Sequence, residues 1–336
     1  MGIEPFALND FKTKRISMNL NYTLKPSTLS FSSRLYWDES DLLNMLDMLM
    51  QARSRTSDWR YWHVGELLWV FFMVDCHLNP QECIRLWHSA EGKLIGFAIL
   101  GEDPNFDCQV LPEYEWRGIE HEALVWVETR LVELRRQDAQ QWGGHLVSGA
   151  RQDDPKRIAF LEQRGFRYCG DFAEVNMLRS MEQPIPSPLL PAGCQVRALA
   201  ETGEIAERAA IQRAVWQPWS VGNVSAEQYA RFMRLPGYRR DLDVVTVAAD
   251  GAMAAYVNGW LDPLNRIGDF GPVGAHPAYR RQGLTRAALL ESMRQMQALG
   301  MERVCISTGV SNEAAIRLYE SIGFRVVNRY LDYVKE

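Results

Sequence analysis

Near the C-terminal end of the chain, apolar residues recur at helical spacing directly after an extended apolar stretch. Leu289, Met293 and Met296 stand four and three residues apart, which predicts one buried helical face that ends before Gly300. The preceding stretch, 267–275, is apolar and punctuated by glycine, and it predicts a strand. The turn between them therefore lies at a helix N-terminus, where backbone N–H groups without intrahelical partners favour an anion.

The same order of elements occurs twice along the chain. Ala123, Val127 and Leu131 predict a comparable helix in the first half. Each half then continues with a strand and a second helix that closes on Gly-Phe, at 154–166 and at 312–324. This internal repeat predicts a mixed α/β fold, an α+β arrangement on a mixed sheet, built as two tandem domains.

A proline-rich stretch separates the two repeats. Residues 182–194 contain four prolines and can join neither a helix nor the interior of a sheet, so they are interpreted as a linker. We expect an N-terminal arm at 1–30, a first domain at 31–181 and a second domain at 195–336. The second domain carries the anion-binding turn.

The composition is that of a globular protein. Of the 336 residues, 47% are hydrophobic and 24% are charged, and the formal net charge is −5, which argues against partners such as nucleic acid or a membrane. Cys76, His77, Cys83 and His88 lack standard zinc spacing, so no metal is expected. Without a signal peptide or a membrane span we expect a cytoplasmic protein, with the choice between monomer and homodimer open.

Positive charge is concentrated in the turn before the C-terminal helix. This turn consists of Arg280, Arg281, Gln282, Gly283, Leu284, Thr285 and Arg286. Gly283 lets the backbone approach a ligand closely, small Thr285 opens the first turn of the helix, and the arginines add full charges to the partial charges of the N–H groups. The turn therefore suits a diphosphate.

Two sequence motifs indicate a known family. Arg-x-x-Gly-x-Thr after Val-x-Ala-His-Pro resembles the acetyl-CoA loop of the GCN5-related N-acetyltransferases (the GNAT family), with Thr285 in place of the usual glycine or alanine. The segment from Asn312 to Phe324 resembles the family's Asn-x-x-Ala-x-x-Leu-Tyr-x-x-x-Gly-Phe helix, which lies beside the pantetheine arm. The resemblance covers 195–336 and, with the internal repeat, implies two tandem GNAT-like domains.

The resemblance implies an N-acetyltransferase that uses acetyl-CoA as co-substrate and acts on a primary amine of a small-molecule or peptide acceptor. The residues expected to bind acetyl-CoA are Val273, Gly274, Ala275, Arg280, Arg281, Gln282, Gly283, Leu284, Thr285, Arg286, Asn312 and Ala315. A backbone N–H of 273–275 would polarise the thioester carbonyl. Tyr319 would protonate the leaving thiolate, because a phenol is a proton donor at neutral pH.

Asp269 is the residue expected to assist deprotonation of the amine, with Asp262 and His276 as competitors. It lies four residues before Val273, and this even spacing predicts that both side chains share one face of the strand. Pro272 cannot join a regular ladder, so a bulge or a separation of strands is expected beside it. In the family the pantetheine enters at such a gap.

The first half lacks the residues that are expected to bind acetyl-CoA and to protonate the thiolate in the second half. Its turn carries Glu115 and Glu120, whose carboxylates would repel a diphosphate, and Leu161 stands where Tyr319 stands in the second half. We expect that the first domain keeps the fold and has lost the cofactor, with weak binding rescued by Arg117 as the alternative.

Two other functions stay open. One is a transferase for a thiol precursor, since mycothiol synthase also resembles two tandem domains of this family with a degenerate first half. The other is a CoA-binding regulatory protein with little turnover.

Overall fold

The computed structural model describes residues 30–56, 60–70, 77–200, 203–217 and 224–336. Residues 1–29, nearly all of the expected arm, lie outside this description. The first half contains β1 (Phe31–Leu35), α1 (Glu39–Thr56), α2 (Val64–Trp69), α3 (Pro80–Cys83), β2 (Ile84–Ser89), β3 (Leu94–Gly101), β4 (Asn105–Val110), α4 (Ile119–Gln137), α5 (Ala139–Trp142), β5 (Leu146–Arg151), α6 (Pro155–Gln163) and β6 (Arg167–Ser180).

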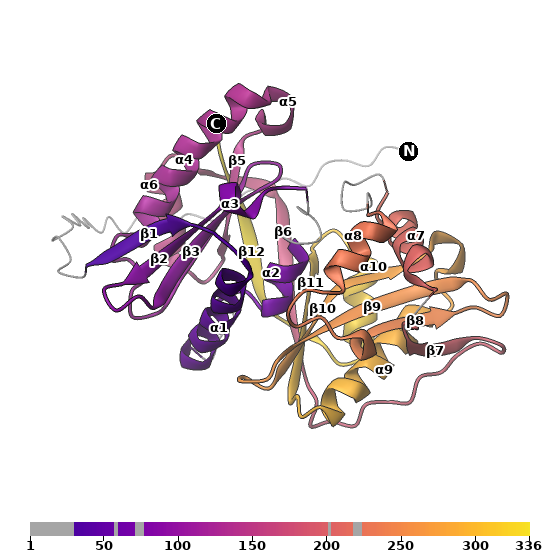
Figure 1. The fold of residues 1–336 in the computed structure, drawn as a ribbon. Helices are drawn as coiled ribbons and strands as arrows, with labels where there is room; N and C mark the ends of the chain where they lie inside the picture. Colours follow the sequence, from indigo (N-terminus) through magenta and orange to yellow (C-terminus); the bar gives the residue numbers. More distant parts are fainter. Residues whose placement is uncertain (1–29, 57–59, 71–76, 201–202, 218–223) are drawn as a thin grey trace, which may run out of the picture.

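The second half repeats this order after the proline-rich stretch. It contains β7 (Gln195–Ala198), α7 (Ile205–Trp216), α8 (Ala226–Phe232), the 3-10 helix η3 (Arg240–Leu242), β8 (Asp243–Val247), β9 (Met253–Asp262), β10 (Ile267–Ala275), the 3-10 helix η4 (Pro277–Tyr279), α9 (Leu284–Ala298), β11 (Arg303–Gly309), α10 (Glu313–Ser321) and β12 (Arg325–Lys335). In Figure 1, α7 and α8 lie on one face of this half of the sheet and α9 on the other.

The repeat extends to the ends of the helices. Helices α4 and α9 both start after a glycine in the left-handed region, with φ of 118° at Gly118 and 77° at Gly283. Helices α6 and α10 both start with a side-chain cap, because Asp154 and Asn312 each accept a backbone N–H three residues ahead. Corresponding helices of the two halves therefore start in the same way.

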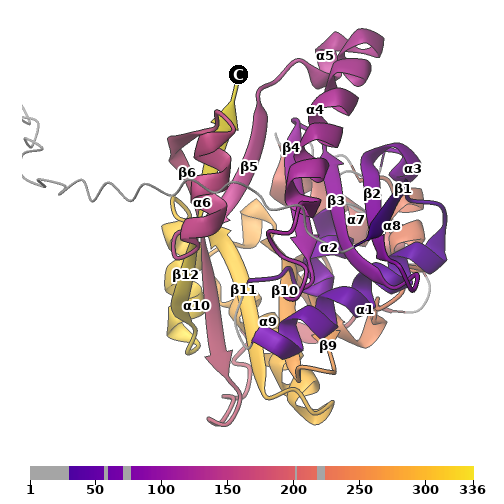
Figure 2. The ribbon, with the colours of Figure 1, turned by 90° about the vertical axis from the view of Figure 1, so that its left-hand side faces the viewer.

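The two halves share one sheet. Its strand order is β1-β2-β3-β4-β5-β12-β6-β11-β10-β9-β8-β7, a mixed sheet to which the described residues contribute 12 strands. Strand β12 pairs with β5 and β6, whereas β6 pairs with β11 and β12, so each half receives the last strand of the other beside its fifth strand. Figures 1 and 2 show the yellow β12 lying among the strands of the first half. The boundaries at 182–194 remain a proposal, since the ladder runs across both halves.

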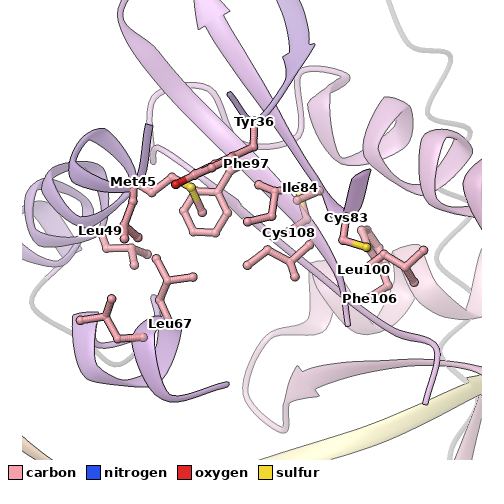
Figure 3. Packing of buried hydrophobic residues seen from close by; sticks show 14 of the residues in the cluster. Tyr36, Met45, Leu49, Leu67, Cys83, Ile84, Phe97, Leu100, Phe106 and Cys108 are labelled. Atoms are coloured by element: carbon pink, nitrogen blue, oxygen red, sulfur yellow. The ribbon is translucent and has the colours of Figure 1, made fainter. Parts of the chain in front are cut away.

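The hydrophobic core also continues across the junction. In the first half, Met45 and Leu49 of α1 face Phe97 of the sheet (Figure 3). The same buried cluster reaches Trp260 of the second half. A Cβ built on Gly65 of α2 would lie 2.3 Å from Cγ of Trp260, so this glycine allows α2 to pack closely on the second half.

None of the helices in the described ranges is both long enough and apolar enough to cross a membrane.

Candidate active site at the junction of the halves

The positively charged turn has the geometry of an anion cradle. Arg281 and Gly283 adopt positive φ, and α9 begins at Leu284. Ala287 is the first residue whose N–H bonds within the helix, to the carbonyl of Gly283 at 3.0 Å, so the N–H groups of 284–286 precede the first intrahelical bond. A Cβ on Gly283 would meet nothing within 4 Å, which leaves open space over the turn for a ligand. The residues present therefore fit a diphosphate.

The predicted gap beside Pro272 is confirmed. Strands β10 and β11 pair in parallel only from Ile267 to Phe270 on the β10 side. Between Phe270 and Val273 the pairing of β10 with β9 shifts register. Residues 273–275 therefore leave β11 and stay paired with β9 alone, and their backbone borders the opening between β10 and β11.

The bulge overturns the expected orientation of Asp269. Asp269 pairs with Trp260 of β9 and Val273 pairs with Val257, so their partners are three residues apart although they themselves are four apart. The extra residue at the bulge inverts the alternation of side chains, and Asp269 and Val273 face opposite sides of the sheet. The prediction of a shared face was wrong because Pro272 causes the irregularity that the even count ignored.

Asp269 lies in a buried polar site to which both halves contribute. The Cys305 thiol of β11 donates to its Oδ1 at 3.1 Å, and Nδ1 of His63, at the start of α2, lies 3.8 Å from its Oδ2. Burial raises the pKa of Asp269 to about 6, against the opposing effects of the Cys305 hydrogen bond and the positive charge of Arg53. The pKa of Glu66 on α2 is raised well above its usual value by burial and then by the Asp269 carboxylate. At neutral pH Asp269 is largely ionised and can accept a proton.

The two competitors of Asp269 have other partners. Asp262 lies 3.4 Å from Nε of Arg53 and accepts hydrogen bonds from the backbone and side chain of Asn265 at 3.0 and 2.6 Å. His276 caps η4, since its Nδ1 accepts the N–H of Ala278 at 3.3 Å. Both residues therefore have a structural interaction in this fold.

Tyr319 lies on α10 in the cluster that also holds Phe270 and Val273, on the opposite face of the sheet from Asp269. It is 5% exposed, and burial raises its pKa, so the phenol keeps its proton at neutral pH. Asn312 caps α10 by accepting the N–H of Ala315 at 3.3 Å, which defines its local role. The loop residues Arg280, Arg281 and Gln282 are exposed, whereas Thr285 and Arg286 are half-buried.

The corresponding turn of the first half holds its own carboxylate. Oε1 of Glu120 accepts the backbone N–H of Trp116 at 2.7 Å, and the residue is 5% exposed. An acidic side chain thus takes a backbone donor at the place where the second half leaves its turn open. The loss of the cofactor from the first half stays a prediction, which this arrangement favours.

Sequence reasoning missed the residues that the first half adds to the site. His63, Glu66 and Arg53 belong to the helices before the first hairpin and lie about 200 residues from Asp269 along the chain. No spacing pattern links them to the anion turn. The packing of α2 on β9 and β10, and of α1 on α2, brings them there.

Comparison with known proteins agrees with this fold. The family model described as "Acetyltransferase (GNAT) family" matches residues 208–324. The mycothiol acetyltransferase of Nocardiopsis dassonvillei is 33% identical over 267 residues, which cover 70% of this chain and 76% of that protein. The chain belongs to the GCN5-related N-acetyltransferase (GNAT) family. It has a tandem GNAT arrangement and is an acetyltransferase of the GNAT type.

Two solved structures show the same fold over nearly the whole chain. A GCN5-related N-acetyltransferase from Sphaerobacter thermophilus has a TM-score of 0.63 at 19% identity, covering 91% of this chain and 95% of its own. A tandem GNAT protein from the clavulanic acid biosynthesis pathway has a TM-score of 0.62 at 16% identity, covering 92% and 98%. Among the residues described in our structure, no group of three or more His, Cys, Asp or Glu is placed to hold a metal ion.

Proposed function

We propose that the second half, 195–336, transfers an acetyl group from acetyl-CoA to a primary amine, and that 31–181 forms a degenerate partner domain without a cofactor. The observation that carries the proposal is the gap between β10 and β11, with the open turn before α9 at one end. Enzymes of the GNAT family use acetyl-CoA, and the turn supplies backbone donors and arginines for its diphosphate.

The roles of the site residues follow from the two faces of the sheet. A backbone N–H of 273–275 would donate to the thioester oxygen as negative charge develops on it. Asp269, on the face shared with α2, would take the proton that the attacking amine loses. Tyr319, on the opposite face, would give its proton to the sulfur as the carbon–sulfur bond breaks. One group thus accepts a proton and another supplies one, so the exchange is balanced.

The surroundings of Asp269 favour a positively charged acceptor. Asp269 supplies the negative charge, since its pKa of about 6 leaves it ionised at neutral pH, whereas burial raises the pKa of Glu66 well above its usual value and favours its neutral form. An alkylammonium group is attracted to the Asp269 carboxylate before it loses its proton.

Isothermal titration of acetyl-CoA into the intact protein tests the proposal, with Gly283→Glu and Gly118→Glu as matched variants of the two turns. We expect one binding site that is abolished by Gly283→Glu and retained by Gly118→Glu. Two sites, or loss of binding in Gly118→Glu, would contradict the inert first half. Absence of binding in the wild-type protein would refute the acetyltransferase mechanism. If the wild-type protein binds acetyl-CoA at a single site, a screen of amine acceptors is the next experiment.

A second candidate concerns the acceptor. The relatives from Nocardiopsis dassonvillei and Thermobispora bispora are both named mycothiol acetyltransferase. The second relative is 26% identical over 244 residues, which covers 69% of this chain and 77% of that protein. We propose a mycothiol-type acceptor as the first to include in the amine screen. Transfer to simple amines but not to this acceptor would reject it while leaving the general proposal intact.

A further inference from the structure

The first half has a cavity at the position that corresponds to the cofactor gap of the second half. Strands β4 and β5 pair at Asn105 and Val147 only, so they separate beyond this point as β10 and β11 do. The cavity there is lined by Asp107 of β4, Glu120 of α4 and Tyr330 of β12, and also by Arg60, Arg151 and Arg157. The cavity is therefore closed in part by a strand of the other half.

One buried acceptor in this cavity has no partner. Glu120 is 5% exposed, and its Oε1 accepts the N–H of Trp116. Its Oε2 is buried and makes no hydrogen bond with the described part of the chain. A carboxylate oxygen removed from water without a donor is costly, and burial accordingly raises the pKa of Glu120.

The other charged groups that line the cavity have partners. Arg60 pairs with Glu115 at 3.0 Å, Arg151 pairs with Asp153 at 2.7 Å, and Asp154 accepts the backbone N–H of Arg157 at 3.0 Å. Arg157 donates to the carbonyl of Gly149 at 3.2 Å and to Oγ of Ser148 at 3.1 Å. Asp107 accepts from Nε2 of Gln109 at 2.8 Å. The group that lacks a partner is thus a negatively charged hydrogen-bond acceptor. The complementary ligand group is a positively charged hydrogen-bond donor.

We propose that this cavity of the first half binds a small organic cation, an alkylammonium or guanidinium group that donates to Oε2 of Glu120. The first half would thus bind a cation at the position where the second half has its anion-binding turn and cofactor gap. The bound cation lies against Tyr330 on β12, the strand that follows the helix of Tyr319. The same carboxylate disfavours a diphosphate.

Titration of the intact protein with n-butylammonium and with methylguanidinium, followed by calorimetry and by ligand-observed NMR, tests this site. Glu120→Gln keeps an oxygen for the N–H of Trp116 and removes the charge, so the fold is retained. We expect about ten- to a hundredfold weaker binding in Glu120→Gln. Glu133→Gln, an exposed carboxylate on the same helix, leaves the affinity unchanged.

Three results would overturn the assignment. One is the absence of binding of either probe up to about 50 mM. Another is binding that is equally tight in Glu120→Gln and wild type. A third is binding that survives Glu120→Gln and is lost in Asp269→Asn, which would locate the cation in the acceptor site of the second half. Because acetyl transfer is not measured, these results are independent of the proposed function.

Discussion

Replacing Asp269 with asparagine is expected to stabilise the protein at high pH. The carboxylate is buried, and its pKa is raised from 3.8 to about 6 in the folded state. The folded protein therefore binds this proton more tightly than the unfolded chain does. As the pH rises from 3.8 through about 6, the wild type must bury a charge that the unfolded chain exposes to water, so folding becomes less favourable. Asparagine is neutral at every pH and avoids this loss.

The magnitude follows from the two pKa values. The difference between 3.8 and about 6 corresponds to about 3 kcal/mol of unfolding free energy, all of it lost above the higher pKa. Between about pH 4 and about pH 8, the stability of Asp269→Asn relative to wild type should rise by about 2 kcal/mol. Any constant cost of fitting the amide beside Cys305 cancels in this comparison. Removing the charge of Asp269 also removes one cause of the raised pKa of Glu66, and this adds to the gain in stability at high pH.

Urea denaturation of both proteins at the two pH values measures this change. Asp153→Asn is the control of opposite sign, because the guanidinium of Arg151 lowers the pKa of Asp153 to about 2. Its carboxylate stabilises the folded state above the unfolded pKa, and this contribution is lost as the pH falls through about 2. Asp153→Asn should therefore lose stability at neutral pH. A pH-independent difference for Asp269→Asn, or a loss that grows with pH, would refute the reasoning.

Two further predictions concern the reaction and the fold. Tyr319→Phe should lower kcat for acetyl transfer by about 10²-fold or more with unchanged affinity for acetyl-CoA, measured by steady-state kinetics and titration; an unchanged kcat would exclude Tyr319 as the acid. Fragments 1–181 and 195–336, made separately, should fail to fold and should assemble when produced together, as judged by circular dichroism and gel filtration. Two separately folded, monomeric fragments would contradict the shared sheet.

The sequence predicted the local parts of the site and missed the parts that depend on long-range packing. The turn around Gly283 and the gap beside Pro272 could be predicted, since both follow from the conformational limits of single residues. The face of Asp269 could not, because one inserted residue at the bulge inverts the alternation. The positions of His63 and Glu66 could not be predicted either, since they depend on how α2 packs on β9 and β10 of the second half.

The exchange of strands explains why the second half depends on the first. The ladder partners of β6 are β11 and β12, both from the second half, and the ladder partners of β12 are β5 and β6, both from the first. Neither strand would have a neighbour within its own half of the described chain. The first half also brings His63 and Glu66 to the face of Asp269. None of these contributions depends on the turn before α4, so the first half completes the sheet and lines the face of Asp269 whether or not it binds a cofactor.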